Sequence, residues 1–471
     1  MHKNSVLIAC GVALALLGTA ARTESLLDVY QQAVTNDPLI READARRMAA
    51  LEAKPQARGV LFPQFNVNGQ VATRDTTSNS TFNQAVDADG NPATPPEIVI
   101  VNNTQTTDAD FWNYTAQITQ TVFRWDQWQT LQRADSEVAL AEANYRAAQQ
   151  DLLVRVSQRY FDVLAAEDTL AAAEATAQAV SRQLEQAEKR FEVGLIAITD
   201  VQEARAAQDS ATAGVIAAKR SLATTQELLR ELTGEAYTDL VKPGEDMPLD
   251  QPQPLDEQLW VEQSLEQNLE VIAARLGVDI AKRDVNIARS GHMPTVDLFA
   301  QRTEYDSTAT QVNNGRKGPA DSDQEQDTIG IQVTVPIFSG GVTQSRVRQQ
   351  VYLHRASREK LEYSQRVAER ATRDAYLGVL AERARVGALK QAVKSNQTAL
   401  EATEAGFEVG TRTTVDVLLA RQRLFESQRD YARSRYDYLL NVLRLRLAAG
   451  TLDDKGIADI NSILIENVRV R

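Results

Sequence analysis

The chain has 471 residues, with 51 basic and 64 acidic side chains and a net charge of −13. This balance argues against a nucleic-acid-binding protein, because a surface that binds phosphate needs an excess of basic residues. General solubility and an acidic internal surface would explain the acidity equally well.

The first 22 residues have the layout of a secretory signal peptide. A short positive start, Met1–Lys3, is followed by an apolar run from Val6 to Leu17 and by small residues up to Ala21. The run is shorter than the about 20 apolar residues that a membrane-spanning helix needs. We expect cleavage after Ala20 or Ala21, and lipidation at Cys10 is the less favoured alternative.

Cys10 is the only cysteine, so the mature chain is expected to lack disulfides and thiol chemistry. His292 and His354 are the histidines that would remain, which argues against a His/Cys metal site. We therefore expect no metal and no cofactor. The mature chain also has no apolar run long enough for a transmembrane helix, so any membrane crossing must be made by β-strands.

Four segments alternate between apolar and polar residues as strands do: 62–73, 111–123, 294–304 and 327–338. Each has roughly the length that a tilted strand needs to cross a bilayer. A soluble antiparallel sheet with one wet face would give the same alternation. The polar stretches inside each pair, 74–110 and 305–326, are expected to be loops.

Two very long helices follow the strand pairs, at 127–192 and 342–408, and each leads into a shorter helix, 199–232 or 413–448. The first long segment contains no Pro or Gly, whereas Gly378 and Gly387 interrupt the second. About 65 helical residues reach about 100 Å, far more than a compact domain needs.

The chain is an internal duplication. Phe191-Glu-Val-Gly194 reappears as Phe407-Glu-Val-Gly410 at an offset of about 216 residues, and each copy is followed by a similar turn and an Asp-Val pair. We expect a first repeat at 23–233, a proline-rich linker at 234–256, a second repeat at 257–448 and a C-terminal segment at 449–471. Each repeat contains a helix, a strand pair, a long helix and a shorter helix.

The turns after the long helices carry recognisable cap signals. Gly194 and Gly410 suit the left-handed position that ends a helix. Thr199-x-x-Gln202 resembles a capping box, and Thr413-x-x-Asp416 a weaker one. Stabilisation of a helix N-terminus is therefore the simplest role for Asp200 and Asp416.

Four strands cannot close a barrel alone, since the smallest spanning barrels have about 8. A symmetric oligomer is required, and two copies would supply 8 strands and three would supply 12. Counting does not choose between them.

The order of these elements, the Phe-x-Val-Gly turns and the opening segment Asp28–Pro38 resemble the TolC family of outer-membrane efflux and secretion channels. The resemblance implies a mixed α and β membrane protein that forms a homotrimer. It implies a 12-stranded β-barrel with four strands per subunit, continuous with a 12-helix α-barrel. The linker 234–256 and the segment 449–471 would form a small mixed equatorial region.

The family resemblance also implies location and partners. The duct would lie in the outer membrane of a Gram-negative bacterium, in contact with its lipid, and extend into the periplasm. It would be a passive exit for tripartite efflux pumps or type I secretion, without enzymatic activity. A periplasmic adaptor and an inner-membrane translocase of the RND, ABC or MFS type would be its partners, and nucleic acid would not.

Two groups of site residues follow from the resemblance. A periplasmic constriction would involve Asp200, Phe407, Arg412 and Asp416, with Asp200 and Arg412 pairing between neighbouring hairpins. Leu419 stands where some relatives carry a second acid. The adaptor-docking turns would comprise Val193, Gly194, Leu195, Val409, Gly410 and Thr411.

Other classes of protein fit less well. The chain has no phosphate loop, nucleophile elbow or metal-ligand cluster, which argues against an enzyme. A periplasmic adaptor or a non-conducting coiled-coil structural protein would explain the long helices, but not the duplicated strand pairs.

Overall fold

The computed structural model describes residues 24–86, 97–237, 239–244 and 247–465. The expected signal peptide, residues 1–22, lies outside the described residues. The chain divides into two compact units, a strand unit made of residues 49–139 and 276–359, and a helical unit made of the remainder. Each unit is described by itself.

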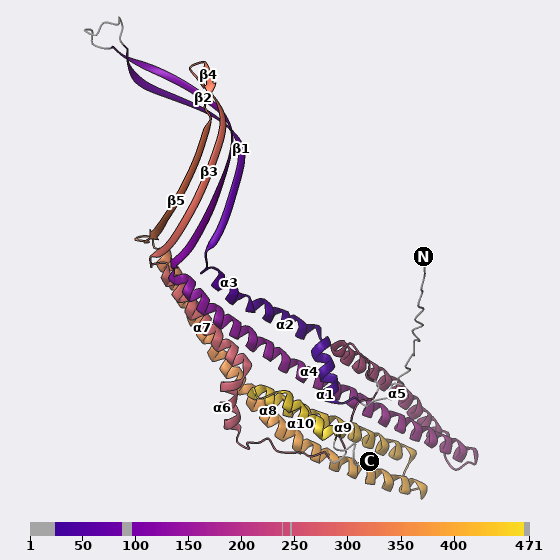
Figure 1. The fold of residues 1–471 in the computed structure, drawn as a ribbon. Coiled ribbons are helices and arrows are strands. Elements are labelled where there is room, and N and C mark those ends of the chain that lie inside the picture. Colours follow the sequence, from indigo (N-terminus) through magenta and orange to yellow (C-terminus); the bar gives the residue numbers. More distant parts are fainter. Residues whose placement is uncertain (1–23, 87–96, 238, 245–246, 466–471) are drawn as a thin grey trace, which may run out of the picture. The chain divides into compact units, whose positions relative to one another are not determined.

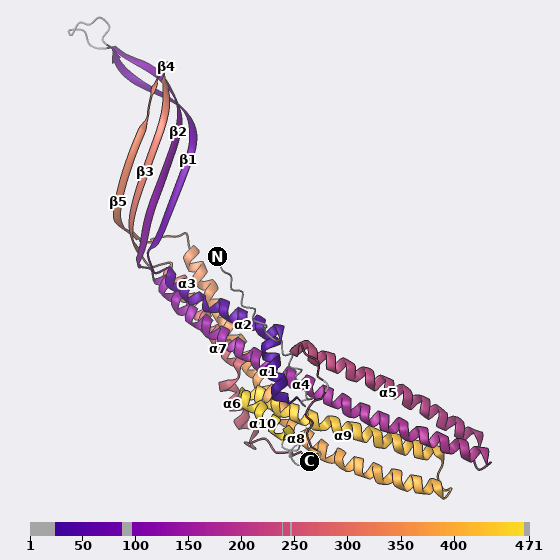
Figure 2. The same ribbon diagram turned by 45° about the vertical axis from the view of Figure 1, so that its right-hand side comes forward.

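The strand unit contains one antiparallel sheet (Figures 1 and 2). Its strands are β1 (Gln64–Val86), β2 (Glu97–Phe123), β3 (Thr295–Asn313), β4 (Arg316–Pro319) and β5 (Ser322–Thr334). β2 lies between β1 and β3. On its other side β3 pairs with β5 over its first part and with the short β4 near its C-terminal end. The short helix α3 (Ala53–Gly59) precedes β1.

The strands are longer than the alternation predicted. The expected loop 74–110 is wrong for the residues described, because β1 and β2 stay paired from Gln64↔Thr119 to Val86↔Glu97. The expected loop 305–326 is also mostly strand. Polar residues predominate on both faces in these stretches, and the apolar residues among them, such as Phe82 and Ile98–Ile100, do not alternate over a long enough run to indicate a strand. Interstrand backbone hydrogen bonds do not require an apolar face, and Thr favours the extended backbone.

The helical unit is built from parts of α2, α4, α7 and α8 and from complete shorter helices. The bounds are α1 (Leu26–Asn36), α2 (Pro38–Leu51), α4 (Trp125–Glu192), α5 (Ile198–Thr233), α6 (Glu257–Gln267), α7 (Leu269–Ser290), α8 (Val342–Glu408), α9 (Thr414–Ala449) and α10 (Asp454–Ile465). α4 has 68 residues and α8 has 67, so each is about 100 Å long.

α8 runs without a break through Gly378 and Gly387, which interrupt only the residue pattern of this segment. A glycine inside a helix costs about 1 kcal/mol relative to alanine, which a helix with many packed turns tolerates. Gly378 also lies against α9, where a β-carbon would come within 3.7 Å of the Asn441 side-chain oxygen.

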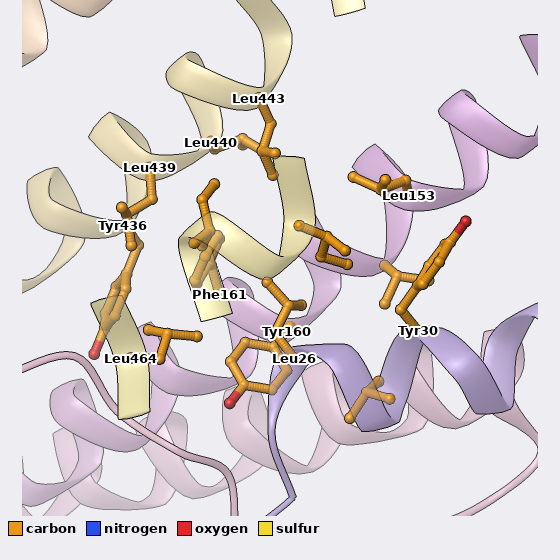
Figure 3. Close-up of a cluster of buried hydrophobic side chains, with 14 of the residues drawn as sticks. Leu26, Tyr30, Leu153, Tyr160, Phe161, Tyr436, Leu439, Leu440, Leu443 and Leu464 are labelled. Atoms are coloured by element: carbon orange, nitrogen blue, oxygen red, sulfur yellow. The ribbon is translucent and has the colours of Figure 1, made fainter. Parts of the chain in front are cut away.

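Two antiparallel hairpins, α4 with α5 and α8 with α9, place their turns at one end of the helical unit (Figures 1 and 2). At the other end of the hairpins, side chains from α1, α4, α9 and α10 gather in one buried core (Figure 3). Tyr160, Leu443 and Leu464 are fully buried there. This core fixes the bases of both hairpins, and their turns extend away from it.

Among the described residues, no helix combines the length and the apolar character needed to cross a membrane.

Candidate functional site: the two hairpin turns

The turn between α4 and α5 is a Schellman motif. Gly194 has a left-handed backbone with φ of 76°. Its amide donates to the Phe191 carbonyl at 2.9 Å, and the Leu195 amide donates to the Arg190 carbonyl, also at 2.9 Å. Val193 and Leu195 are left exposed on either side of the glycine.

The turn between α8 and α9 repeats this geometry. Gly410 has φ of 79°. Its amide donates to the Phe407 carbonyl at 3.1 Å, and the Thr411 amide donates to the Gly406 carbonyl at 2.8 Å. Val409 is exposed, as Val193 is in the first turn. The predicted glycine caps are therefore confirmed in both turns, and each presents an apolar side chain to the surroundings.

The helices that follow the turns begin differently. α9 has the predicted capping box: the Thr413 hydroxyl accepts from the Asp416 amide at 3.2 Å, and the Asp416 carboxylate accepts from the Thr413 amide at 2.9 Å. α5 begins after Ala197, which offers no side-chain cap. The prediction of a capping box at Thr199 was wrong, because the position equivalent to Thr413 is Ala197 and Thr199 lies inside the helix.

Asp416 is engaged in this cap. Hydrogen bonds from the Thr413 amide and hydroxyl, helped by the nearby charge of Arg412, lower the pKa of the Asp416 carboxyl. The carboxylate therefore carries its charge at neutral pH while it stabilises the N-terminus of α9. Asp200 lies in the first turn of α5, where a negative charge is also favourable.

Phe407 lies between the two hairpins. Its ring packs against the cluster of Leu400, Val417 and Leu424 within the second hairpin. The guanidinium of Arg190, from α4, lies 4.7 Å from the centre of the ring. This cation–π contact joins the end of α4 to the end of α8.

The structure brings together some of the predicted gate residues and not others. Arg412, Asp416 and Phe407 belong to the second turn and its flanking helices, whereas Asp200 belongs to the first. Within the described parts of this single chain, neither Asp200 nor Arg412 forms an ion pair.

Two further ion pairs at the hairpin ends were missed by the sequence analysis. Arg205 of α5 pairs with Glu188 of α4 at 2.9 Å, and Arg421 of α9 pairs with Glu404 of α8. In both pairs the partners are 17 residues apart, and the two pairs are related by the duplication offset. Aligning the two repeats would have shown that Glu188 and Arg205 recur as Glu404 and Arg421, which is the signal that the sequence offers.

The linker between the repeats is fastened by side chains, another feature that the sequence did not indicate. The Tyr160 hydroxyl donates to the Val241 carbonyl at 2.7 Å, and the Tyr438 hydroxyl donates to the Asp250 carbonyl at 2.8 Å. Further side-chain donors to carbonyls between residues 244 and 255 come from Arg435, Arg383, Trp260 and Tyr376. We call the described residues 239–244 and 247–255 the strap.

Comparison with known proteins decides the family. The sequence profile described as "Outer membrane efflux protein" matches residues 29–235 and 260–451. The chain belongs to this family. The match includes both hairpins and both of their turns.

Individual members of the outer membrane efflux protein family are similar over almost the whole chain. Outer membrane protein TolC of Escherichia coli K12 is 34% identical over 99% of this chain and 90% of its own length. The alkaline protease secretion protein AprF of Pseudomonas aeruginosa is 27% identical over 94% of this chain and 88% of its own. A crystal structure of CusC has the same fold, with a TM-score of 0.71 and 18% identity over 91% of this chain and 92% of that one.

This efflux family protein is therefore an outer-membrane efflux and secretion channel of Gram-negative bacteria, and it has no enzymatic activity. The sequence predictions of family, location and non-enzymatic transport are confirmed. Long antiparallel helices joined to β-strands, the coarse part of the predicted fold, are confirmed as well.

Proposed function

We propose that three copies of this chain assemble into one continuous duct, with a 12-stranded β-barrel in the outer membrane and a 12-helix α-barrel in the periplasm. Residues 1–22 would direct export and then be removed. The repeats, 23–233 and 257–448, would each supply one strand pair and one hairpin. The linker 234–256 and the segment 449–471 would form the equatorial region.

The observation that carries this proposal is a sheet with two free edges and an exposed apolar face. In the described chain β1 has a strand partner only in β2, and β5 only in β3. On one face Val71 is 85% exposed and Ile331 67%. Unpaired edges are not tolerated in lipid, so the edges must pair with those of other copies.

We propose that the ends of the hairpins form the gate of the resting duct. Asp200 of one hairpin would pair with Arg412 of a neighbouring hairpin, and Phe407 and Asp416 would line the narrowest point. An exposed ion pair contributes about 0.2–1 kcal/mol, so three copies favour closure by roughly a few kcal/mol. A partner that binds the open form more tightly can overcome a preference of this size.

The exposed apolar turn residues are suited to contact with a partner. We propose that they dock a periplasmic adaptor, which joins the duct to an inner-membrane translocase of the RND, ABC or MFS type. The name of AprF supports protein secretion as one use of the duct, and the family name supports efflux. The docking surface would comprise Val193, Gly194, Leu195, Val409, Gly410 and Thr411.

Cross-linking and planar-bilayer recordings of the purified protein test this function. We expect cross-linked trimers and small single-channel conductance in the wild type. Arg412→Ala and Asp200→Ala should both increase the conductance. Arg205→Ala serves as the control, since Arg205 pairs with Glu188 inside one hairpin.

The two parts of the proposal can fail separately. Unchanged conductance in both Arg412→Ala and Asp200→Ala would rule out the gate but leave the duct in place. A protein that stays monomeric and never conducts would contradict the assembled duct itself.

A further inference from the structure

The two faces of the sheet differ in charge as well as in polarity. We call the face that carries Val71 and Ile331 the apolar face. Toward the end of the sheet that holds the β3–β4 hairpin, this same face carries many charged side chains. Arg302 pairs there with Glu325 at 3.0 Å and with Asp327 at 3.3 Å. Register places further carboxylates on the same face, at Asp75, Asp108, Asp110, Glu304, Asp306 and Asp323.

The opposite face, which we call the polar face, is almost free of charge. Successive rows across β1, β2, β3 and β5 consist of Asn, Gln, Thr and Tyr, as in Asn66–Gln117–Gln301–Thr328, Asn68–Thr115–Thr303–Gln326 and Gln70–Asn113–Tyr305–Gln324. Among the described side chains of these four strands, this face has two charged groups. They are Asp297, near the start of β3, and Arg74, toward the end of the sheet that holds the β3–β4 hairpin. Arg316 of β4 lies beyond Arg74, beside the tip of the β3–β4 hairpin.

Arg74 is positioned by aromatic rings. Its guanidinium lies 4.8 Å from the centre of the Phe111 ring. Phe111 is 6% exposed and stacks on Tyr305 with their centres 5.6 Å apart. Within the described residues Arg74 makes no ion pair, and its side chain is exposed. An arginine keeps its positive charge at any physiological pH, so this face displays a fixed, unpaired cation.

We propose that Arg74 is a charge-selective element of the duct wall, which favours the passage of anions at the outer end of the barrel. The inference rests on the proposed function, in which the polar face lines the water-filled interior. Three copies would place three guanidinium groups on a wall whose other charged groups, Asp297 and Arg316, lie at different levels of the sheet. Fixed charges in a confined aqueous path concentrate ions of the opposite sign and tune selectivity.

Neighbouring charges set the size of this effect. Asp75, Asp108 and Asp110 are close to Arg74 along the strands, but their side chains emerge on the opposite face. Salt screens charges over about 8 Å at physiological ionic strength and over about 30 Å at 0.01 M. The influence of Arg74 should therefore be modest in concentrated salt and should grow as the salt is diluted.

The test is the reversal potential of the reconstituted trimer under a KCl gradient. Arg74→Gln should lower the chloride-to-potassium permeability ratio, and Arg74→Glu should lower it further. Arg74→Lys should retain the wild-type ratio, which shows that charge rather than packing is responsible. The differences should increase in dilute KCl. Arg302→Gln is the matched control, because it removes an arginine from the other face of the same sheet and should leave the ratio unchanged.

Each other outcome is decisive. A conducting Arg74→Glu trimer with the wild-type permeability ratio would overturn the role of Arg74 and leave the duct intact. A shift in Arg302→Gln, without one in Arg74→Gln, would show that the other face lines the water path. Absence of conductance in the wild type would instead overturn the proposed function.

Discussion

Thr413 and Ala197 occupy equivalent positions at the starts of α9 and α5, yet only Thr413 caps its helix. The Thr413 hydroxyl and the Asp416 carboxylate satisfy amides that have no partner within the helix. The first turn of α5 lacks this arrangement. The two hairpins therefore differ in local stability at the site where the proposed gate lies.

Thr413→Ala should loosen the start of α9, because an N-cap substitution of this kind costs about 1 kcal/mol. Hydrogen exchange of the amides in the first turn of α9 should be roughly fivefold faster, as that energy implies. Ala197→Thr provides the reciprocal change and should slow exchange in the first turn of α5. Equal exchange in wild type and Thr413→Ala would show that the cap contributes nothing there.

Individual residues could be predicted from the sequence where one residue type is strongly preferred in one local conformation. Gly194 and Gly410 were found because a left-handed helix end favours glycine. Thr199 was misassigned because the spacing Thr-x-x-Gln occurs inside helices as well as at their starts. The pair Arg205–Glu188 was missed because its partners are on different helices, so helical spacing within either one gives no sign of it.

The strap shows what limits prediction for whole elements. Its prolines correctly indicated that the linker would not be helical, and its described residues contain no helix. Because a non-helical segment has no helical hydrogen bonds, its carbonyls must accept hydrogen bonds from other parts of the chain. The donors come from α4, α6, α8 and α9, which meet only in the folded helical unit, so no local pattern in the linker announces them.

Tyr438→Phe removes one of these donors while keeping the ring that is buried beside the strap. The loss of a buried hydrogen bond should destabilise local attachment of the strap by about 1 kcal/mol. Limited proteolysis should therefore cut the linker several times faster than in the wild type. Tyr145→Phe is the control, since it also removes a tyrosine hydroxyl from the helical unit, but the Tyr145 ring packs against Arg47 and its hydroxyl donates to no carbonyl of the described strap residues. Identical cleavage rates in Tyr438→Phe and wild type would contradict a fastening role.

For the strands, alternation located the apolar part of each element and missed the rest. Beyond Val71 in β1 and before Trp112 in β2, polar residues predominate without a regular apolar–polar alternation, yet pairing continues as far as Val86↔Glu97. β5 ends at Thr334, earlier than expected, and Pro336 follows it without an amide to donate. Backbone pairing therefore sets the length of these strands. A single sequence indicates such pairing only where one face of the strand is apolar.

On the scale of the whole molecule, an isolated copy leaves both edges of the sheet open and one apolar face exposed. The chain also carries two helical hairpins of matching length, α4 with α5 and α8 with α9. The alternation, the strand count and the duplication predicted these features, but the number of copies in the proposed duct would depend on contacts between chains. Such contacts leave no signal in the spacing of residues within one chain.

Adjacent residues of β5 offer a direct test of which face meets lipid. Ile331 is 67% exposed on the apolar face, and Gln332 is exposed on the polar face. Ile331→Lys should destabilise the trimer in lipid vesicles by about 2–4 kcal/mol per subunit if the site lies near the middle of the membrane. Gln332→Lys should cost far less, because its charge would remain in water. Chemical unfolding of both variants in vesicles measures the difference between their free energies of unfolding. No difference would show that neither side chain meets lipid. A larger loss in Gln332→Lys would show that the polar face meets lipid instead.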